Sequence, residues 1–225
     1  MDKIRGLEKR GTMGASISTS LKALISYLKF NNVVVRLGIN IKNENRNLNA
    51  EKEVIPNSDE LAKILRIATL RERVSISLMS FSGLRPEVLG NINGIDGLVL
   101  GDIPDIRIEK DSAEFEKIPC RITVRYELSK IRQQYFTFIG PEGSKYLKEY
   151  LELRMNDGER LTHDSPIILP VEKQSLDKKN KFLPTKLLPR RIKDTIVKAG
   201  FDWRPYIFRI CFRTYLDTAE GNGFI

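Results

Sequence analysis

Between two apolar segments the chain reads Phe81-Ser82-Gly83-Leu84-Arg85-Pro86-Glu87-Val88-Leu89-Gly90. Gly83 permits a tight turn, and Arg85 stands on that turn with a carboxylate two residues later. A second arginine-centred segment, far along the sequence, reads Trp203-Arg204-Pro205-Tyr206-Ile207-Phe208-Arg209. The planar fork of arginine forms paired, charge-assisted hydrogen bonds with phosphate oxygens. Two such arginines in a basic chain predict a clamp around one phosphate group.

The composition favours a globular protein with a polyanionic partner. The 225 residues are 41% hydrophobic and 30% charged, which is enough apolar material for a core. The formal net charge is +9, so the chain attracts polyanions. Nucleic acid is the partner we expect, with an anionic membrane surface or simple solubility as the alternatives.

Cysteine and histidine usage argues against metal and disulfide chemistry. Cys120 and Cys211 are the only cysteines and neither lies in a CxxC pattern, so we expect no disulfide framework, no zinc site and a reducing, cytoplasmic compartment. His163 is the only histidine, which excludes any two-histidine site. No secretory signal opens the chain and no apolar run is long enough to span a bilayer. We expect no cofactor, no small-molecule substrate and no membrane partner.

Two regions differ in pattern. Residues 1–20 are polar and rich in small residues, which predicts a frayed arm, followed by a helix from Ser20 to Phe30. The segment 40–57 is dominated by Asn, Lys and Glu and predicts a linker. We therefore expect residues 1–55 to form an arm, a partial helix and a linker, and residues 56–225 to form the main domain.

The main domain predicts a mixed α+β fold, a mainly helical body with a small antiparallel β-sheet. Asn57 with Glu60 three residues later is a capping-box pattern, and further helices are expected over 72–81, around Val88, and over 141–154, 189–199 and from Pro205 onward. Alternating apolar and polar residues predict strands over 106–109, 122–126 and 134–139. Lys130 falls at or near the hairpin between the last two strands. The apolar residues of the last helix recur at helical spacing, namely Phe208, Cys211, Phe212, Tyr215, Leu216 and Ala219.

Each candidate site residue has an ordinary structural alternative. Arg85 is either a phosphate ligand or a surface arginine paired with Glu87. Arg209 lies in the first turn of a helix, where backbone N–H groups attract anions, so a cation there is poorly placed unless an anion binds. Lys130 is either a solvated turn lysine or a proton donor to a leaving oxygen. Arg204 either joins the same basic patch or is solvated.

Three tyrosines and the histidine are expected to have structural roles only. Tyr135, Tyr146 and Tyr150 fit core or sheet-face positions. His163 lies beside Asp164 in a polar loop, which predicts an exposed, non-catalytic side chain.

Together these segments resemble the catalytic domain of tyrosine recombinases, the phage-integrase family, and in particular its archaeal integrase branch. The resemblance rests on the first arginine segment extended to Asn91, on Val124-Arg125-Tyr126-Glu127-Leu128-Ser129-Lys130, and on the segment from Gly200 to Arg209. It covers the chain from Pro56 onward. The three motifs in this order are more specific than any one of them.

The resemblance implies strand exchange on duplex DNA during integration and recombination of a mobile element. A tyrosine attacks the scissile phosphodiester, two arginines hold its non-bridging oxygens, and a hairpin lysine protonates the leaving 5′-oxygen, without metal or ATP. By motif, Arg85 and Arg209 are the arginines and Lys130 is the lysine. Tyr206 stands where the family usually has histidine. The implied DNA contacts add Arg204, Arg213, Lys178 and Lys179.

The sequence departs from the family pattern at both ends. The family's nucleophilic tyrosine follows the second arginine after a Gly-His or Gly-Trp type segment, and these residues hold no such segment. The helical core-binding domain that normally comes first has room only for its last helix. The resemblance therefore implies an integrase domain truncated at both ends and inactive alone, with other integrase protomers as possible partners. The alternatives are a non-catalytic DNA-binding protein and a basic protein-interaction domain that uses the apolar face of the last helix.

Overall fold

The computed structural model describes residues 2–34, 38–44, 54–110, 112–170 and 181–221. The chain forms two compact units, one spanning residues 1–53 and one spanning residues 54–225. Each unit has its own set of elements and is treated by itself.

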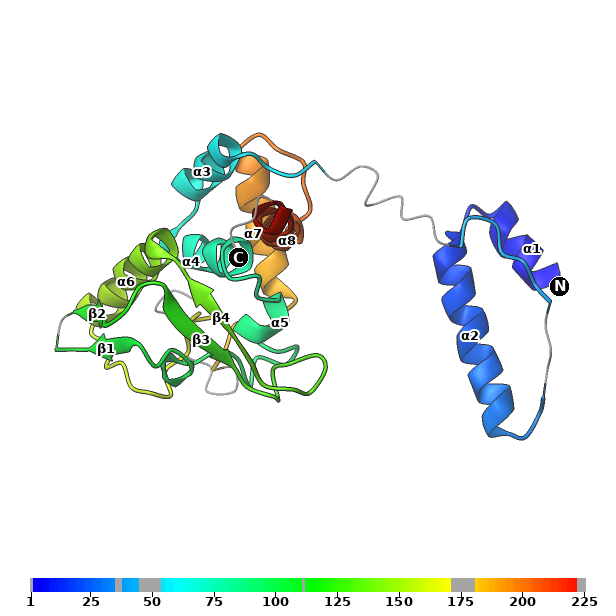
Figure 1. The fold of residues 1–225 in the computed structure, drawn as a ribbon, viewed down its shortest axis with the longest axis horizontal. Helices are drawn as coiled ribbons and strands as arrows, with labels where there is room; N and C mark the ends of the chain where they lie inside the picture. The colour runs from blue at the N-terminus through cyan, green and yellow to red at the C-terminus, as the bar shows by residue number, and fades with distance from the viewer. Residues whose placement is uncertain (1, 35–37, 45–53, 111, 171–180, 222–225) are drawn as a thin grey trace. The chain divides into compact units, whose positions relative to one another are not determined.

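The first unit is a pair of helices, α1 (Asp2–Lys9) and α2 (Gly14–Phe30) (Figure 1). The expectation of a frayed arm over residues 1–20 is therefore wrong. The glycines and serines of this segment are poor helix formers. Ile17 in α2 and Ile41 in the segment that follows α2 are nevertheless both buried, so packing outweighs the low helix propensity. The Ser18 hydroxyl donates to the Glu44 carboxylate at the same place.

The second unit is mainly helical with two short antiparallel hairpins, which confirms the α+β class (Figure 1). In chain order its elements are α3 (Ser58–Ile67), α4 (Leu70–Ser80), α5 (Pro86–Leu89), a 3-10 turn at Leu100–Asp102, β1 (Ile106–Ile108), β2 (Ala113–Phe115), β3 (Cys120–Val124), β4 (Tyr135–Ile139), α6 (Pro141–Asn156), α7 (Leu187–Lys198) and α8 (Ile207–Gly221).

Two capping boxes start the helical body. The Asn57 side chain accepts from the backbone N–H of Glu60, whose carboxylate accepts from that of Asn57, both at 2.9 Å, as the sequence predicts. A second box joins Thr69 and Glu72, so α4 begins at Leu70 rather than at Glu72. These reciprocal bonds satisfy N–H groups that a helix start leaves unpaired.

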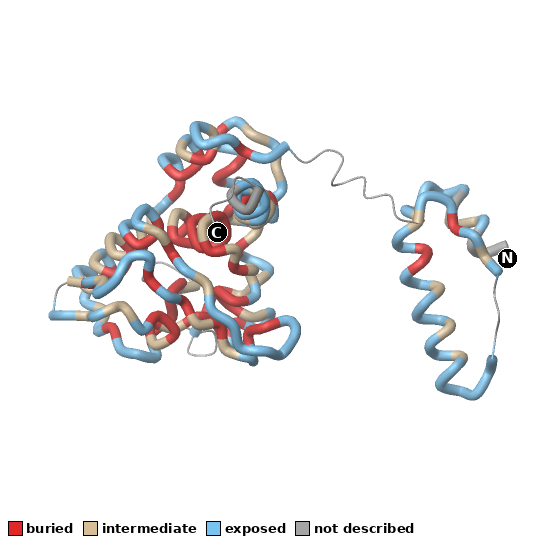
Figure 2. The backbone as a smooth tube through the Cα atoms, viewed as in Figure 1, coloured by how far each residue is buried: buried red, intermediate tan, exposed pale blue. Residues whose placement is uncertain are grey.

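The core is built around α4. This helix contacts α3, α6, α7 and α8, and it is buried along almost its whole length (Figure 2). Because it is enclosed, its sequence shows little amphipathic contrast, and even Arg71 and Glu72 are buried and paired at 3.3 Å. Its C-terminal end leads directly into the turn at Gly83, so the most buried helix of the unit positions that turn.

The strands form two separate two-stranded sheets rather than the single sheet expected. In one, β1 pairs with β2, a strand that the sequence did not indicate. In the other, β3 pairs with β4 in a register that sets Cys120 opposite Ile139 and Val124 opposite Tyr135. Lys130 lies in the loop that joins β3 to β4, where the sequence places it.

The apolar stripe of α8 is only partly covered. Phe208 and Cys211 are fully buried, whereas Tyr215 and Leu216 are each 47% exposed. The expected interaction patch is thus smaller than proposed, because Phe208 belongs to the core that includes α4. The side chain of Ala219 lies outside the part of the chain that the structure describes. Burial raises the pKa of the Cys211 thiol to about 11.

Replacing Phe208 by alanine is expected to lower the free energy of unfolding of the second unit by about 3–5 kcal/mol, because it empties a fully buried site. Urea denaturation followed by circular dichroism measures the change. On the same helix the exposed Arg213→Ala should change stability by less than about 0.5 kcal/mol. Equal losses for both variants would contradict the assignment of Phe208 to the core.

Candidate functional site

A pocket of about 360 Å³ brings together the three residues that the sequence singles out, Arg85, Lys130 and Arg209. Its walls come from the α4–α5 turn, the β3–β4 hairpin and the start of α8. The lining residues are Ser82, Gly83, Arg85, Val88, Leu128, Ser129, Lys130, Ile131, Tyr135, Phe136, Thr137, Arg209 and Phe212. Three segments distant in sequence therefore form one basic cavity.

The turn that carries Arg85 is fixed by backbone geometry. Gly83 has φ = 63°, a left-handed conformation that side-chain-bearing residues rarely adopt. A Cβ at this position would also overlap the ring of Phe212 on α8. Leu84 is fully buried and its N–H donates to the carbonyl of Leu78 at 3.1 Å. Arg85 follows as the residue preceding α5, so its backbone is held between two helices.

Arg209 is bonded to the same turn. Its Nε donates to the Gly83 carbonyl at 2.9 Å, across 126 residues of sequence. Its Nη1 donates to the Tyr206 hydroxyl at 3.3 Å, and the guanidinium lies 5.9 Å from the centroid of that ring. The second arginine is thus oriented by the turn that presents the first.

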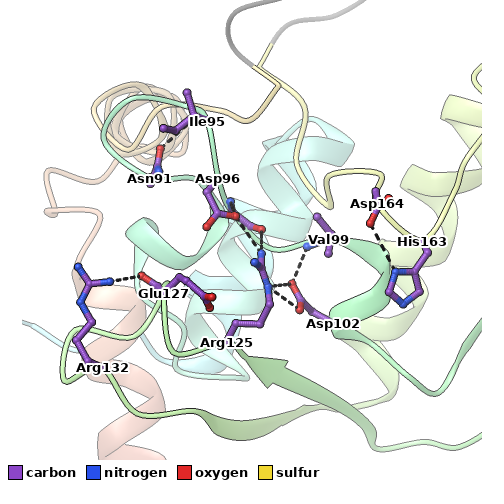
Figure 3. A network of polar contacts seen from close by, with 11 residues as sticks. Asn91, Ile95, Asp96, Val99, Asp102, Arg125, Glu127, Arg132, His163 and Asp164 are labelled. Atoms are coloured by element: carbon purple, nitrogen blue, oxygen red, sulfur yellow. Dashed lines mark hydrogen bonds and ion pairs between the residues drawn. The ribbon is translucent and has the colours of Figure 1, made fainter.

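The hairpin that carries Lys130 is attached to the turn through β4. The Thr137 hydroxyl donates to the Ser82 carbonyl at 2.8 Å. Within the loop, Arg132 Nη1 donates to the Glu127 carbonyl at 3.1 Å (Figure 3). Lys130 itself is exposed, so its ammonium can move while the loop around it is held.

The base of the hairpin loop is anchored by Arg125. Its guanidinium donates to Asp102 and Asp96, both at 3.0 Å, and to the Gly97 carbonyl at 2.8 Å (Figure 3). Burial raises the pKa of Asp102, although the Val99 N–H and Arg125 act to lower it.

The pKa of Arg125 also rises, because the two carboxylates outweigh the opposing effect of burial. Burial therefore dominates the pKa of Asp102 but not that of Arg125. The Asp102 side chain is only 5% exposed, against 33% for Arg125, so it loses more contact with water. Arg125 is therefore a neutralised cation that fixes the loop.

Arg85 and Lys130 differ from Arg125 in this respect. Within the described parts of the chain, neither side chain forms a hydrogen bond or an ion pair, so the alternative of an Arg85–Glu87 pair is not formed. The Ser82 and Ser129 hydroxyls also lack partners among those residues, but both oxygens are buried within the wall and closed off from solvent. The pocket thus offers two cations, Arg85 and Lys130, that no neighbouring acceptor uses.

The other predicted residues lie outside the pocket lining. Tyr206 is 48% exposed and touches the site only through Arg209. Arg204 is exposed, and Arg213 is exposed and lies 3.7 Å from the Asp217 carboxylate. His163 is exposed beside Asp164 at 3.7 Å (Figure 3). Lys178 and Lys179 fall outside the described residues.

The sequence did not indicate four polar residues that line the pocket, namely Ser82, Ser129, Tyr135 and Thr137. Alternation along β4 indicates that Tyr135 and Thr137 share a face, but not that this face is directed to the arginine turn. Only the pairing of the hairpin with that turn assigns them to the site.

Comparison with known proteins gives likenesses in structure only. No protein-family model and no curated protein matches the sequence. The structure of XerA recombinase aligns with a TM-score of 0.50 at 19% identity, over 93% of this chain and 63% of that one. The XerH site-specific recombinase, bound to its palindromic difH substrate in a post-cleavage complex, aligns with a TM-score of 0.51 at 20% identity, over 92% and 57%.

At these identities the likeness establishes the fold. The second unit has the α+β fold of a tyrosine-recombinase catalytic domain. The chain spans less than two thirds of the length of either recombinase. No helix among the described residues combines the length and apolar character needed to cross a bilayer. The same residues contain no cluster of three histidine, cysteine or acidic side chains placed to hold a metal ion.

Substituting Gly83 by alanine is expected to lower the free energy of unfolding by more than about 1 kcal/mol, because alanine is strained at positive φ and displaces Phe212. Thermal denaturation measures the loss. Gly140→Ala is the control without strain, since a Cβ there meets no atom within 4 Å and φ is negative. Because Gly140 is the N-cap of α6, where alanine is less favourable than glycine, we expect a small loss, below that of Gly83→Ala. Equal stability of the two variants would contradict the strained turn.

Proposed function

We propose that the second unit is a tyrosine-recombinase domain that binds duplex DNA and clamps one backbone phosphate between Arg85 and Arg209. The observation that carries the proposal is the single pocket in which both arginines and Lys130 meet. The net charge of +9 and the XerH structure bound to its difH substrate support duplex DNA as the partner. We propose the archaeal integrase branch, a cytoplasmic location, and residues 56–225 as the functional domain.

In this proposal the site stabilises charge on a phosphate under attack. A tyrosine hydroxyl releases its proton to solvent as its oxygen forms a bond to phosphorus, while the bond from phosphorus to the 5′-oxygen breaks. Arg85 and Arg209 hold the non-bridging oxygens as negative charge accumulates on them. Lys130, on its exposed loop, transfers a proton to the departing 5′-oxygen. Tyr206 keeps Arg209 in place in the position of the family histidine. No metal or cofactor takes part in these steps.

The attacking tyrosine comes, in this proposal, from outside the 225 residues. Tyr215 is the only tyrosine after Arg209. Its hydroxyl donates to the Pro56 carbonyl at 3.4 Å, and it does not line the pocket. The domain would therefore bind DNA and need another protomer, or a longer form of the chain, for cleavage.

Replacing both arginines, Arg85→Ala and Arg209→Ala, is expected to weaken duplex binding at least about tenfold, because two charge-assisted phosphate contacts are lost. The dependence of log affinity on log salt should also become less steep, by about 0.9 for each phosphate contact removed. Fluorescence anisotropy of a labelled duplex over a salt series measures both quantities.

The control for that experiment removes the same charge elsewhere. Arg66 and Arg190 are exposed and lie outside the pocket, so Arg66→Ala with Arg190→Ala should keep most of the affinity. If both double variants lose affinity equally, the binding depends on net charge and the clamp is not assembled.

A second candidate function is non-catalytic DNA binding or protein interaction with the fold retained. The exposure of Tyr215 and Leu216 on α8 favours it. A nicked duplex that traps covalent intermediates separates the functions when the chain is mixed with a full-length integrase whose own catalytic arginine is mutated, so that any adduct requires complementation. We expect no adduct with the chain alone and an adduct in the mixture. Binding without any adduct in the mixture would favour the second candidate.

A further inference from the structure

Strand β4 presents one of its faces to the arginine turn. Side chains two residues apart on a strand lie on the same face. The Thr137 hydroxyl donates to the Ser82 carbonyl and Ile139 is fully buried, so this face is directed toward the arginine turn and the core. Tyr135 is the next residue on it; it is 38% exposed and lines the pocket together with Arg85, Arg209 and its neighbour Phe136. Phe136 and Phe138, on the opposite face, are 63% and 44% exposed.

The hydroxyl of Tyr135 is a hydrogen-bond donor that has no acceptor among the described residues. Burial raises its pKa, although the charges of Arg209 and Arg85 act in the opposite direction, which places both guanidinium groups within electrostatic range of the phenol. The phenol therefore keeps its proton at neutral pH and can donate it in a hydrogen bond.

Among the residues that the structure describes, the lining of the pocket contains no carboxylate. A cavity lined by two guanidiniums, an ammonium and a phenol fits an anionic ligand that offers several acceptor oxygens. A tetrahedral oxyanion supplies more oxygens, in more directions, than a planar carboxylate.

We propose that Tyr135 is a further phosphate ligand of this site, whose phenolic hydroxyl donates a hydrogen bond to a non-bridging oxygen of the phosphate held by Arg85 and Arg209. The inference rests on the proposed function, because it assigns a third contact to the same phosphate. Tyr135 acts as a hydrogen-bond donor, and no bond to its oxygen is formed or broken.

The direct test observes the phenol itself. The full chain is prepared with tyrosine labelled by ¹³C at Cζ, and the Tyr135 resonance is assigned as the one absent from Tyr135→Phe. Inorganic phosphate is then titrated against chloride at equal ionic strength. We expect the Tyr135 resonance to shift in a saturable way with phosphate only, and to stay in place in the Arg85→Ala, Arg209→Ala variant.

The second measurement is duplex affinity. Tyr135→Phe should weaken binding about tenfold, the usual effect of losing a hydrogen bond to a charged group, with an unchanged melting temperature. Tyr126→Phe is the matched control, because Tyr126 is 57% exposed near the same hairpin and lies outside the pocket lining. Its affinity should equal that of the wild type.

The outcomes separate this inference from the function on which it rests. If the arginine variant loses affinity, while Tyr135→Phe binds like wild type and the Tyr135 resonance of the wild type does not shift with phosphate, the phosphate clamp stands and the donor role is wrong. If the arginine variant binds like wild type, the clamp fails and the donor role fails with it. A covalent adduct on nicked duplex that disappears in Tyr135→Phe would make Tyr135 the nucleophile and overturn its assignment as a donor.

Discussion

The hydrogen bond from Arg209 Nε to the Gly83 carbonyl is the constraint on which the pocket depends. It joins the start of α8 to the turn that ends α4, the most enclosed helix of the unit. The bond requires that the turn and α8 approach closely. The ring of Phe212 occupies the space that a Cβ on Gly83 would need. Glycine is needed there for its size and for its positive φ together. That one contact orients the Arg209 side chain on the turn that carries Arg85.

Charge alone does not distinguish the cations of this protein, but their surroundings do. Arg125 is held by two carboxylates and a carbonyl, so its charge serves to fix the hairpin loop. Arg85 has no such partner among the described residues, although its backbone is fixed as firmly. A side chain with a fixed backbone and a charge that no neighbour neutralises is available to an anion from outside. The net charge of +9 favours attraction to polyanions in general, whereas this contrast distinguishes Arg85 from the cations that have structural partners.

The sequence allowed the fold class to be predicted, and it singled out the residues that meet in the pocket, because both rest on local signals. Gly83 before Arg85 marks a turn, Asn57 with Glu60 marks a helix start, and both are found. Long-range packing decided the rest. Residues 1–20 contain poor helix formers, but Ile17 and Ile41 are both buried, so packing stabilises the helix. The sequence alone gives Phe208 the same weight as the other apolar residues of α8, and only the packing of α8 shows that it belongs to the core. For Tyr135, the alternation of side chains along β4 indicates which face of the strand it occupies, but not which part of the protein that face contacts.

The separation of Gly83 and Arg209 by 126 residues also bears on the order of folding. Contacts between residues far apart in sequence form late, because a long loop must close before they are made. During synthesis the N-terminal part of a domain emerges first, so the turn, the hairpin and α6 can be present before α8 exists. The arginines can therefore act as a pair only once α8 has been made. A nascent chain in which α8 has not yet been made therefore presents Arg85 without Arg209.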